Sequence, residues 1–138
     1  MQKLAYLLLF FNFMACSENI SVSDLNHLNG YWEIKEVEFP GGERKEYDVN
    51  TTIDYLEYHD MNGFRKKVQP AFDGTYVTSS DAESFQISER DGSFWMSYRN
   101  NLSSWEERIL VISKTELVVR NKEGLSYHYR RFQPINAK

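Results

Sequence analysis

Few residues of this chain are of the types that carry out chemistry, and they are widely spaced. The candidates for metal binding or nucleophilic catalysis are Cys16, His27, His59 and His128, and none of them has the short spacing of a metal motif. Glu106 and Glu107 are adjacent, so in a strand they would face opposite sides and could not flank one glycosidic bond. The sequence has neither a Gly-x-Ser-x-Gly turn nor a glycine-rich phosphate loop. We therefore expect no enzymatic activity, no metal site and no cofactor.

Cys16, the single cysteine, ends an apolar segment at the N-terminus. Lys3 gives a basic head, residues 4–13 are apolar except for Asn12, and the small Ala15 precedes the cysteine. This order is typical of a secretory signal, and the apolar run is shorter than the ~20 residues of a membrane-spanning helix. The alternative is a buried N-terminal helix or strand, which should show polar residues at regular spacing.

The tetrapeptide Phe13-Met14-Ala15-Cys16 resembles the lipobox of bacterial lipoprotein precursors, although Leu is commoner than Phe at its first position. The resemblance implies that residues 1–15 are removed as a signal peptide and that Cys16 is acylated, with palmitate or a similar chain, and anchors the protein in a lipid bilayer. Ser17, in place of Asp, resembles lipoproteins that are sent onward to the bacterial outer membrane. We thus expect a lipid-anchored protein of the cell envelope.

After residue 30, turn signals recur about every ten residues, and they include Asn62-Gly63, Asp73-Gly74 and Asp91-Gly92. Runs of aromatic and β-branched residues between them predict strands near 31–39, 51–59, 63–69, 74–79, 83–90, 93–99, 104–113, 115–121 and 124–132. One helical turn is expected before Gly30, capped by Ser23 or Asp24. The expected fold is all-β, an antiparallel up-and-down meander that closes into a barrel of roughly eight strands.

Gly30-x-Trp32, which opens the first strand after the helical turn, resembles the Gly-x-Trp signature of lipocalins. In that family the Trp closes one end of an eight-stranded barrel, and an Arg from the last strand lies across it. The matching residue here is Arg131. The late motif Ile112 to Val119 is similar to that of lipocalin-like (calycin-type) domains in small bacterial lipoproteins. The implied domains are a lipidated tether with a helical turn at 16–29, the barrel at 30–133 and a tail at 134–138.

Alternation along the strands predicts which side chains face the barrel interior. The expected interior residues, which would contact a ligand, are Phe85, Ile87, Phe94, Met96, Tyr98, Tyr127 and Tyr129. Two functions remain open. The barrel either binds one small apolar or amphipathic ligand, or it is filled by these side chains and acts through its surface as an inhibitor, accessory or assembly protein. The net charge of −4 argues against binding of nucleic acid, and no protein partner can be named.

Overall fold

The computed structural model describes residues 19–133, apart from the side chains of residues 79 and 80. The signal segment, Cys16 and the tail at 134–138 lie outside the described residues, so their predicted roles stay predictions. One 3₁₀ helix precedes nine strands: η1 (Val22–Leu28), β1 (Gly30–Glu38), β2 (Arg44–Glu46), β3 (Ile53–His59), β4 (Asn62–Pro70), β5 (Tyr76–Arg90), β6 (Ser93–Arg99), β7 (Ser104–Ile112), β8 (Glu116–Asn121) and β9 (Ser126–Arg131). None of the described helices is long and apolar enough to span a membrane.

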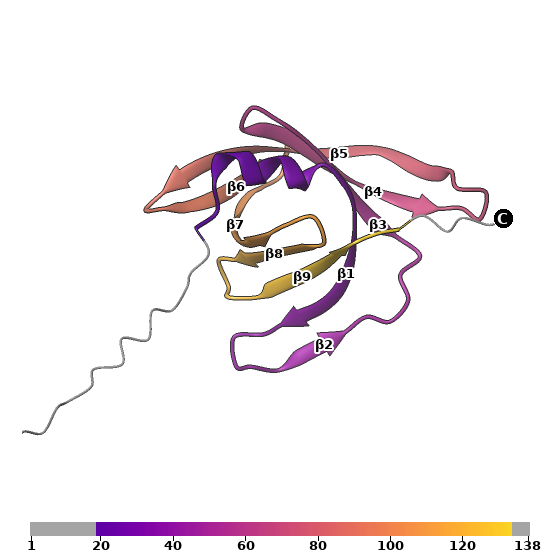
Figure 1. Cartoon of the computed structure of the whole chain (residues 1–138), viewed down its shortest axis with the longest axis horizontal. Helices are drawn as coiled ribbons and strands as arrows, with labels where there is room; N and C mark the ends of the chain where they lie inside the picture. Colours follow the sequence, from indigo (N-terminus) through magenta and orange to yellow (C-terminus); the bar gives the residue numbers. More distant parts are fainter. Residues whose placement is uncertain (1–18, 134–138) are drawn as a thin grey trace, which may run out of the picture.

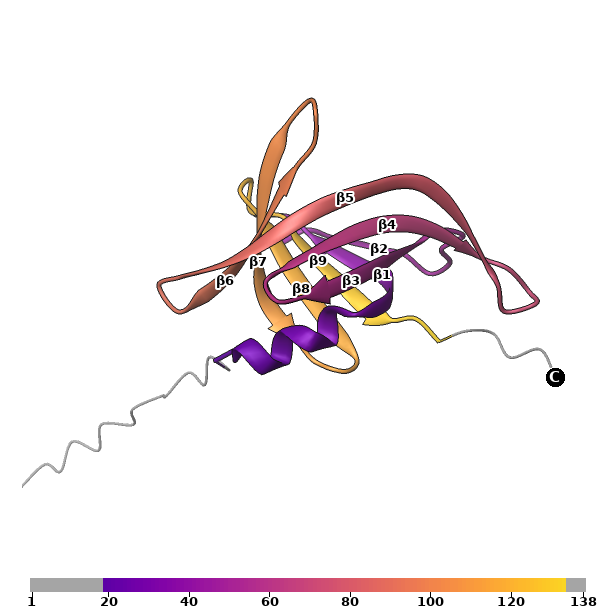
Figure 2. The same ribbon diagram turned by 90° about the horizontal axis from the view of Figure 1, so that it is seen from above.

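The strands form an antiparallel meander in which β9 returns to pair with β1 and closes a barrel (Figures 1 and 2). β2 and β3 pair with successive halves of the same edge of β1, at Glu36–Glu38 and at Gly30–Trp32. The two short strands therefore occupy one position in the wall, and the barrel has eight strands. The predicted all-β, up-and-down, roughly eight-stranded barrel is confirmed.

Two features of the strands differ from the sequence prediction. β2 was not expected, because its three residues, Arg-Lys-Glu, are all exposed and have no apolar alternation. Residues 76–90 form one long strand, and not the two separate strands predicted there. The pairing shifts between Lys66 and Val68 of β4, which are opposite Ala82 and Thr78, so the extra residues form a bulge in β5 and let that strand bend.

The turn before β4 also lies earlier than its Asn62-Gly63 dipeptide suggested. Positive φ angles of 47° and 64° occur at Asp60 and Met61, so the turn consists of those two residues. Gly63 instead lies within β4, where a Cβ atom would overlap the backbone carbonyl of Glu57 and come 2.5 Å from Cζ of Phe85. The glycine is therefore required for close packing inside the barrel, where the Phe85 ring occupies the space of a side chain.

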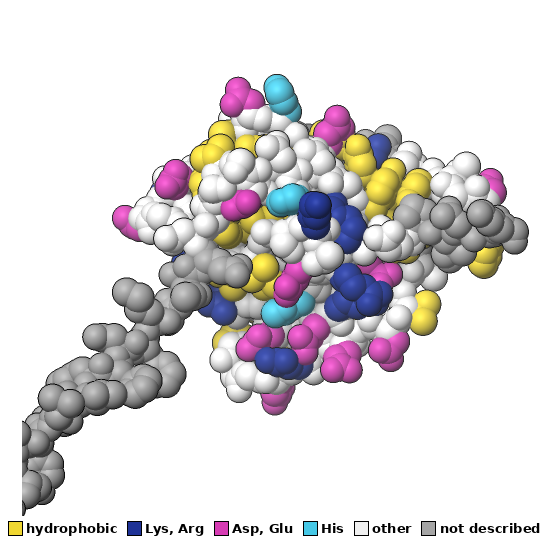
Figure 3. Space-filling model, in the orientation of Figure 1, with side chains coloured by type: hydrophobic (Ala, Val, Ile, Leu, Met, Phe, Trp, Pro, Cys, Tyr) yellow, Lys and Arg dark blue, Asp and Glu magenta, His cyan; other side chains and the backbone are white. Residues whose placement is uncertain are grey.

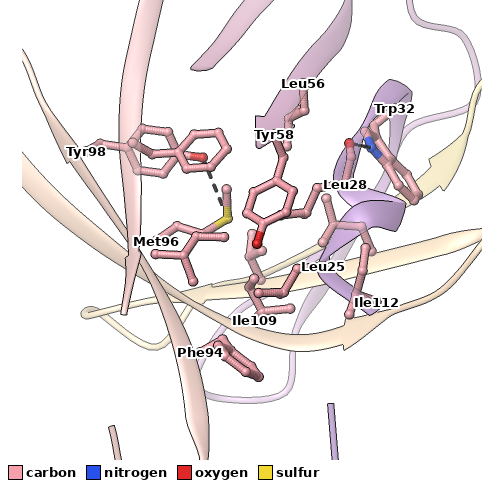
Figure 4. Packing of buried hydrophobic residues seen from close by; sticks show 14 residues of the cluster. Leu25, Leu28, Trp32, Leu56, Tyr58, Phe94, Met96, Tyr98, Ile109 and Ile112 are labelled. Carbon is pink, nitrogen blue, oxygen red and sulfur yellow. Dashed lines mark hydrogen bonds between the residues drawn. The ribbon is translucent and has the colours of Figure 1, made fainter. Parts of the chain in front are cut away.

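The predicted helical turn is present as η1, with Ser21 and not Ser23 or Asp24 at its N-cap. The Asp24 carboxylate accepts hydrogen bonds from the backbone N–H and the hydroxyl of Ser21, at 2.8 and 2.9 Å. Leu25 and Leu28, on the inner side of η1, are completely buried. They pack against Tyr58, Phe94 and other core side chains, so η1 closes one end of the barrel (Figure 4).

Candidate functional site

At the closed end of the barrel, Arg131 lies across Trp32. The two residues are paired on β9 and β1, and the guanidinium carbon is 3.9 Å from the centre of the indole ring. Trp32 has no exposed surface, and its indole N–H donates a hydrogen bond to the carbonyl of Leu28 (2.9 Å), which joins the ring to η1 (Figure 4). The arrangement combines apolar burial with cation–π attraction. It is the geometry implied by the resemblance to lipocalins.

The Arg131 guanidinium also joins three segments of backbone. It donates hydrogen bonds to the carbonyls of His27 (2.6 Å), Asn29 (2.7 Å) and Lys114 (2.9 Å). The first two carbonyls lie at the C-terminal end of η1, where helix carbonyls lack partners within the helix. Gly30 permits this contact, since it has φ of +124° and a Cβ there would lie 2.6 Å from Nη1 of Arg131.

We expect Arg131→Ala to lower the free energy of unfolding by about 2 kcal/mol, because three charge-assisted hydrogen bonds and the contact with the indole are lost. Arg130→Ala is the matched control, since Arg130 is exposed and pairs with Glu33 on the outer surface, at 3.3 Å. It should cost about 0–1 kcal/mol. Urea denaturation measures both values, and equal losses would show that Arg131 has no special role.

The residues expected to contact a ligand are brought together, but the structure does not arrange most of them around an open cup. Phe85, Ile87, Phe94, Met96 and Tyr98 are between 1% and 6% exposed and belong to one packed cluster with η1. Tyr127 and Tyr129 are partly buried and pack against it. The enclosed space beside Met96 and Tyr98 is about 10 Å³, which suits a single water molecule. The aromatic side chains and the two leucines of η1 therefore fill the apolar interior.

A filled interior predicts that Met96→Trp overpacks the barrel. Met96 is 1% exposed, so the added volume must displace its neighbours, and we expect a loss of ~1–3 kcal/mol in the free energy of unfolding. The same substitution at Leu102, which is 95% exposed, should have little effect. Thermal melts of the two variants test this. An unchanged or raised melting temperature for Met96→Trp would show that the interior has unused room.

The interior becomes polar toward the end of the barrel farthest from η1. Arg65 of β4 stacks on the Tyr98 ring, 4.8 Å from its centre, and its guanidinium lies 3.4 Å from the Glu83 carboxylate and 3.7 Å from that of Glu107. Asp54, 3% exposed, pairs with the Lys67 ammonium at 2.5 Å. Burial raises the pKa of Glu107, and the positive charge of Arg65 opposes that rise.

An open cleft of about 950 Å³ lies beside this polar end, along β6, β7 and the β8–β9 turn. Its lining includes Trp95, Tyr98, Trp105, Glu107 and Tyr127. Trp105 and Glu107 are at the start of β7, whereas the closed end uses Ile112 at the end of that strand. The cleft therefore opens away from η1, at the base of the β6–β7 hairpin that projects from the barrel in Figure 2.

Sequence reasoning missed the cleft, although it identified two of its aromatic residues, Tyr98 and Tyr127. It considered Glu107 only as half of a catalytic pair with Glu106. The alternation of side chains along a strand could have identified the cleft residues, because Trp105 and Glu107 are two residues apart in one strand and share its inner face. The sequence pattern did not identify Arg65 either, because its buried position follows only from the β3–β4 register.

Comparisons with known proteins bear on the fold alone. No family model matches this chain, and no curated protein matches its sequence. A lipocalin-like protein from Bacteroides uniformis matches with a TM-score of 0.48 and 12% identity, over 77% of this chain and 99% of that one. An uncharacterized protein from Bacteroides eggerthii matches with a TM-score of 0.47 and 11% identity, over 76% and 99%.

The architecture itself unites the features that the sequence suggested. An eight-stranded meander closes on itself, a short helix covers one end, and an arginine of the last strand stacks on the tryptophan of the first. The described residues therefore form a closed, eight-stranded antiparallel β-barrel with the fold that the resemblance to lipocalins implied.

Proposed function

We propose that this protein is an envelope lipoprotein, anchored through acylated Cys16, whose barrel binds a small amphipathic ligand in the cleft at its polar end. The observation that carries the binding role is the cleft of about 950 Å³, which is lined by aromatic rings and by a buried carboxylate. Small-molecule sites combine apolar walls with a few fixed polar groups in this way. The deep apolar interior is a poor alternative, because its own side chains fill it.

Native mass spectrometry of the full-length protein, extracted in detergent from its own membranes, tests the binding role. A bound small molecule should be present on the parent protein and on Phe72→Ala, which changes an exposed ring outside the cleft. It should be lost from Trp105→Ala, which removes a wall of the cleft. A molecule that survives Trp105→Ala, or no bound molecule on any variant, would contradict binding in the cleft.

The anchor has a separate test. Cells that grow with a tagged fatty acid should label the parent protein, and Cys16→Ser should remove the label and leave an unprocessed precursor. The variant keeps the residues of the cleft unchanged, so a loss of label reports on lipidation and not on folding. Label that persists on the Ser variant would contradict the assignment of the lipobox.

A second function, action through the outer surface, is favoured by an aromatic cluster on the outside of the barrel. Tyr31 stacks on Tyr76 with ring centres 4.1 Å apart and lies 4.9 Å from Tyr55, and Phe132 meets Tyr76 edge-on at 6.5 Å. Hydrophobic side chains gather over β4 in Figure 3. If this surface carries the function, Tyr31→Ser should abolish a stoichiometric protein complex in the membrane extract, whereas Trp105→Ala should leave that complex intact.

A further inference from the structure

Three flat groups form one stack that leads from the polar interior of the barrel to the cleft. The Arg65 guanidinium lies 4.8 Å from the centre of the Tyr98 ring, and the Tyr98 ring is stacked on Trp105 at 5.2 Å with 6° between the planes. Tyr98 covers one face of the indole, and Trp105 lines the cleft. The exposed part of the Trp105 ring is thus a preformed surface on which a flat ligand ring can stack.

The Glu107 carboxylate lies beside this ring, and one of its oxygens accepts no hydrogen bond from the described residues. The residue is 7% exposed, and its Oε2 atom has no hydrogen-bond partner among the described residues. Its nearest cation, Nη1 of Arg65, is 3.7 Å away, beyond hydrogen-bonding distance. Glu107 and Tyr98 line both the cleft and the enclosed 10 Å³ cavity, so they separate the two spaces. A buried carboxylate oxygen without a hydrogen bond is costly, and a donor that enters from the cleft past the side chains covering Oε2 would relieve that cost.

The charges around Glu107 favour a cation as that donor. Among the buried charges of the polar end, the carboxylates of Asp54 and Glu107 face a single cation, Arg65, whereas the side chains of Lys67 and Glu83 are 64% and 42% exposed. One negative charge is therefore unmatched. The cleft also contains Arg108, Arg120 and Lys122, but all three are exposed. Solvent screens exposed charges much more than buried ones, so these cations oppose a ligand cation only weakly.

We propose that the cleft selects an organic cation that carries a flat ring, with the ring on Trp105 and the ammonium group on the Glu107 carboxylate. The inference rests on the proposed binding role of the cleft and names its ligand class. Trp105 and Glu107 are two residues apart on the inner face of β7, a separation of roughly 7 Å. This spacing is short enough for one small molecule to place a ring on Trp105 and an ammonium group, one methylene away from the ring, near the Glu107 carboxylate.

Three matched probes test the proposal: 2-naphthylmethylammonium, 2-naphthylmethanol and 2-naphthoate, which share a ring and differ in charge. Isothermal titration calorimetry of the full-length protein in detergent, with empty micelles as the blank, gives each affinity. We expect the ammonium probe to bind about tenfold more tightly than the alcohol, because an ionised pair is stronger than a neutral hydrogen bond. The carboxylate should bind most weakly.

Glu107→Gln should bring the ammonium and alcohol affinities together, whereas Glu106→Gln should leave the ratio unchanged. Glu106 is a sharp control: it also lines the cleft, but Arg90 already binds its carboxylate at 2.7 Å. Alcohol binding by Glu107→Gln also verifies that the variant is folded. Trp105→Ala should weaken all three probes.

The outcomes separate the two proposals. The ligand class is overturned if the probes bind through Trp105 but show no preference for the cation, or if Glu107→Gln keeps that preference. The cleft would then remain a binding site. If Glu106→Gln removes the preference for the cation as fully as Glu107→Gln does, the preference comes from the overall negative charge of the cleft. That result would also overturn the role of Glu107. No Trp105-dependent binding of any probe overturns the proposed function itself.

Discussion

Trp32→Ala should lower the free energy of unfolding by ~3–5 kcal/mol, the cost of truncating a large core side chain. Three losses combine: a completely buried indole becomes a cavity, Leu28 loses the hydrogen bond to its carbonyl, and Arg131 loses the ring beneath its guanidinium. Because Trp32 joins β1, η1 and β9, its removal should also loosen the closed end of the barrel. Urea denaturation gives the free energy, and hydrogen exchange of the η1 amides reports the local loosening.

Trp95→Ala is the matched control for the loss of an indole. Trp95 is partly exposed, and Arg90 lies 4.5 Å from the centre of its ring. Its truncation should cost about 1 kcal/mol. Trp32→Phe should recover part of the loss, since it keeps a buried ring but lacks the N–H donor. A Trp32→Ala loss no larger than that of Trp95→Ala would show that Trp32 does not hold the closed end together.

Local chemistry predicted most of the wall of the barrel, because each hairpin depends on a few neighbouring residues. Asp91-Gly92 forms the β5–β6 turn with positive φ at both residues, as the dipeptide indicated. The failures have non-local causes. Gly63 suggested a turn, but it serves the packing of Phe85 from the next strand. β2 is held by its pairing with β1 and shows no apolar alternation of its own.

The candidate site was harder to predict than the fold. Alternation identified inward residues such as Met96 and Tyr98, yet parity gives the direction of a side chain and not the space around it. Whether a barrel is filled depends on how Leu25 and Leu28 of η1 pack into its end, which no single strand encodes. The burial of Arg65 similarly follows from its register opposite Leu56 and Glu83.

Arg65→Met should cost about 3–5 kcal/mol at neutral pH, a loss typical of breaking a buried ion pair by removal of one partner. Methionine keeps much of the volume, so the loss comes from charge: Glu107 loses its nearest cation, and Tyr98 loses the guanidinium on its ring. The double variant Arg65→Met/Glu107→Gln should recover much of the stability, because the buried carboxylate is gone. Lys66→Met, which removes a cation from the outer face, should have little effect.

The cost of Arg65→Met should grow with pH. Burial raises the pKa of Glu107 in the folded protein, and removal of Arg65 raises it further, because that cation favours the ionised carboxylate. Below the pKa of the unfolded chain, Glu107 is protonated in both states and contributes no difference. At higher pH the unfolded chain releases this proton first, so folding loses stability as the pH rises toward the folded pKa.

Asp54, Glu83 and Lys67 face the same site and remain in both proteins, so comparison with the parent isolates the effect. Urea denaturation at pH 5 and pH 8 should give a larger difference at pH 8, and the Glu107→Gln background should remove most of that dependence. A pH-independent difference would mean that Arg65 acts through packing on Tyr98 and not through the charge of Glu107.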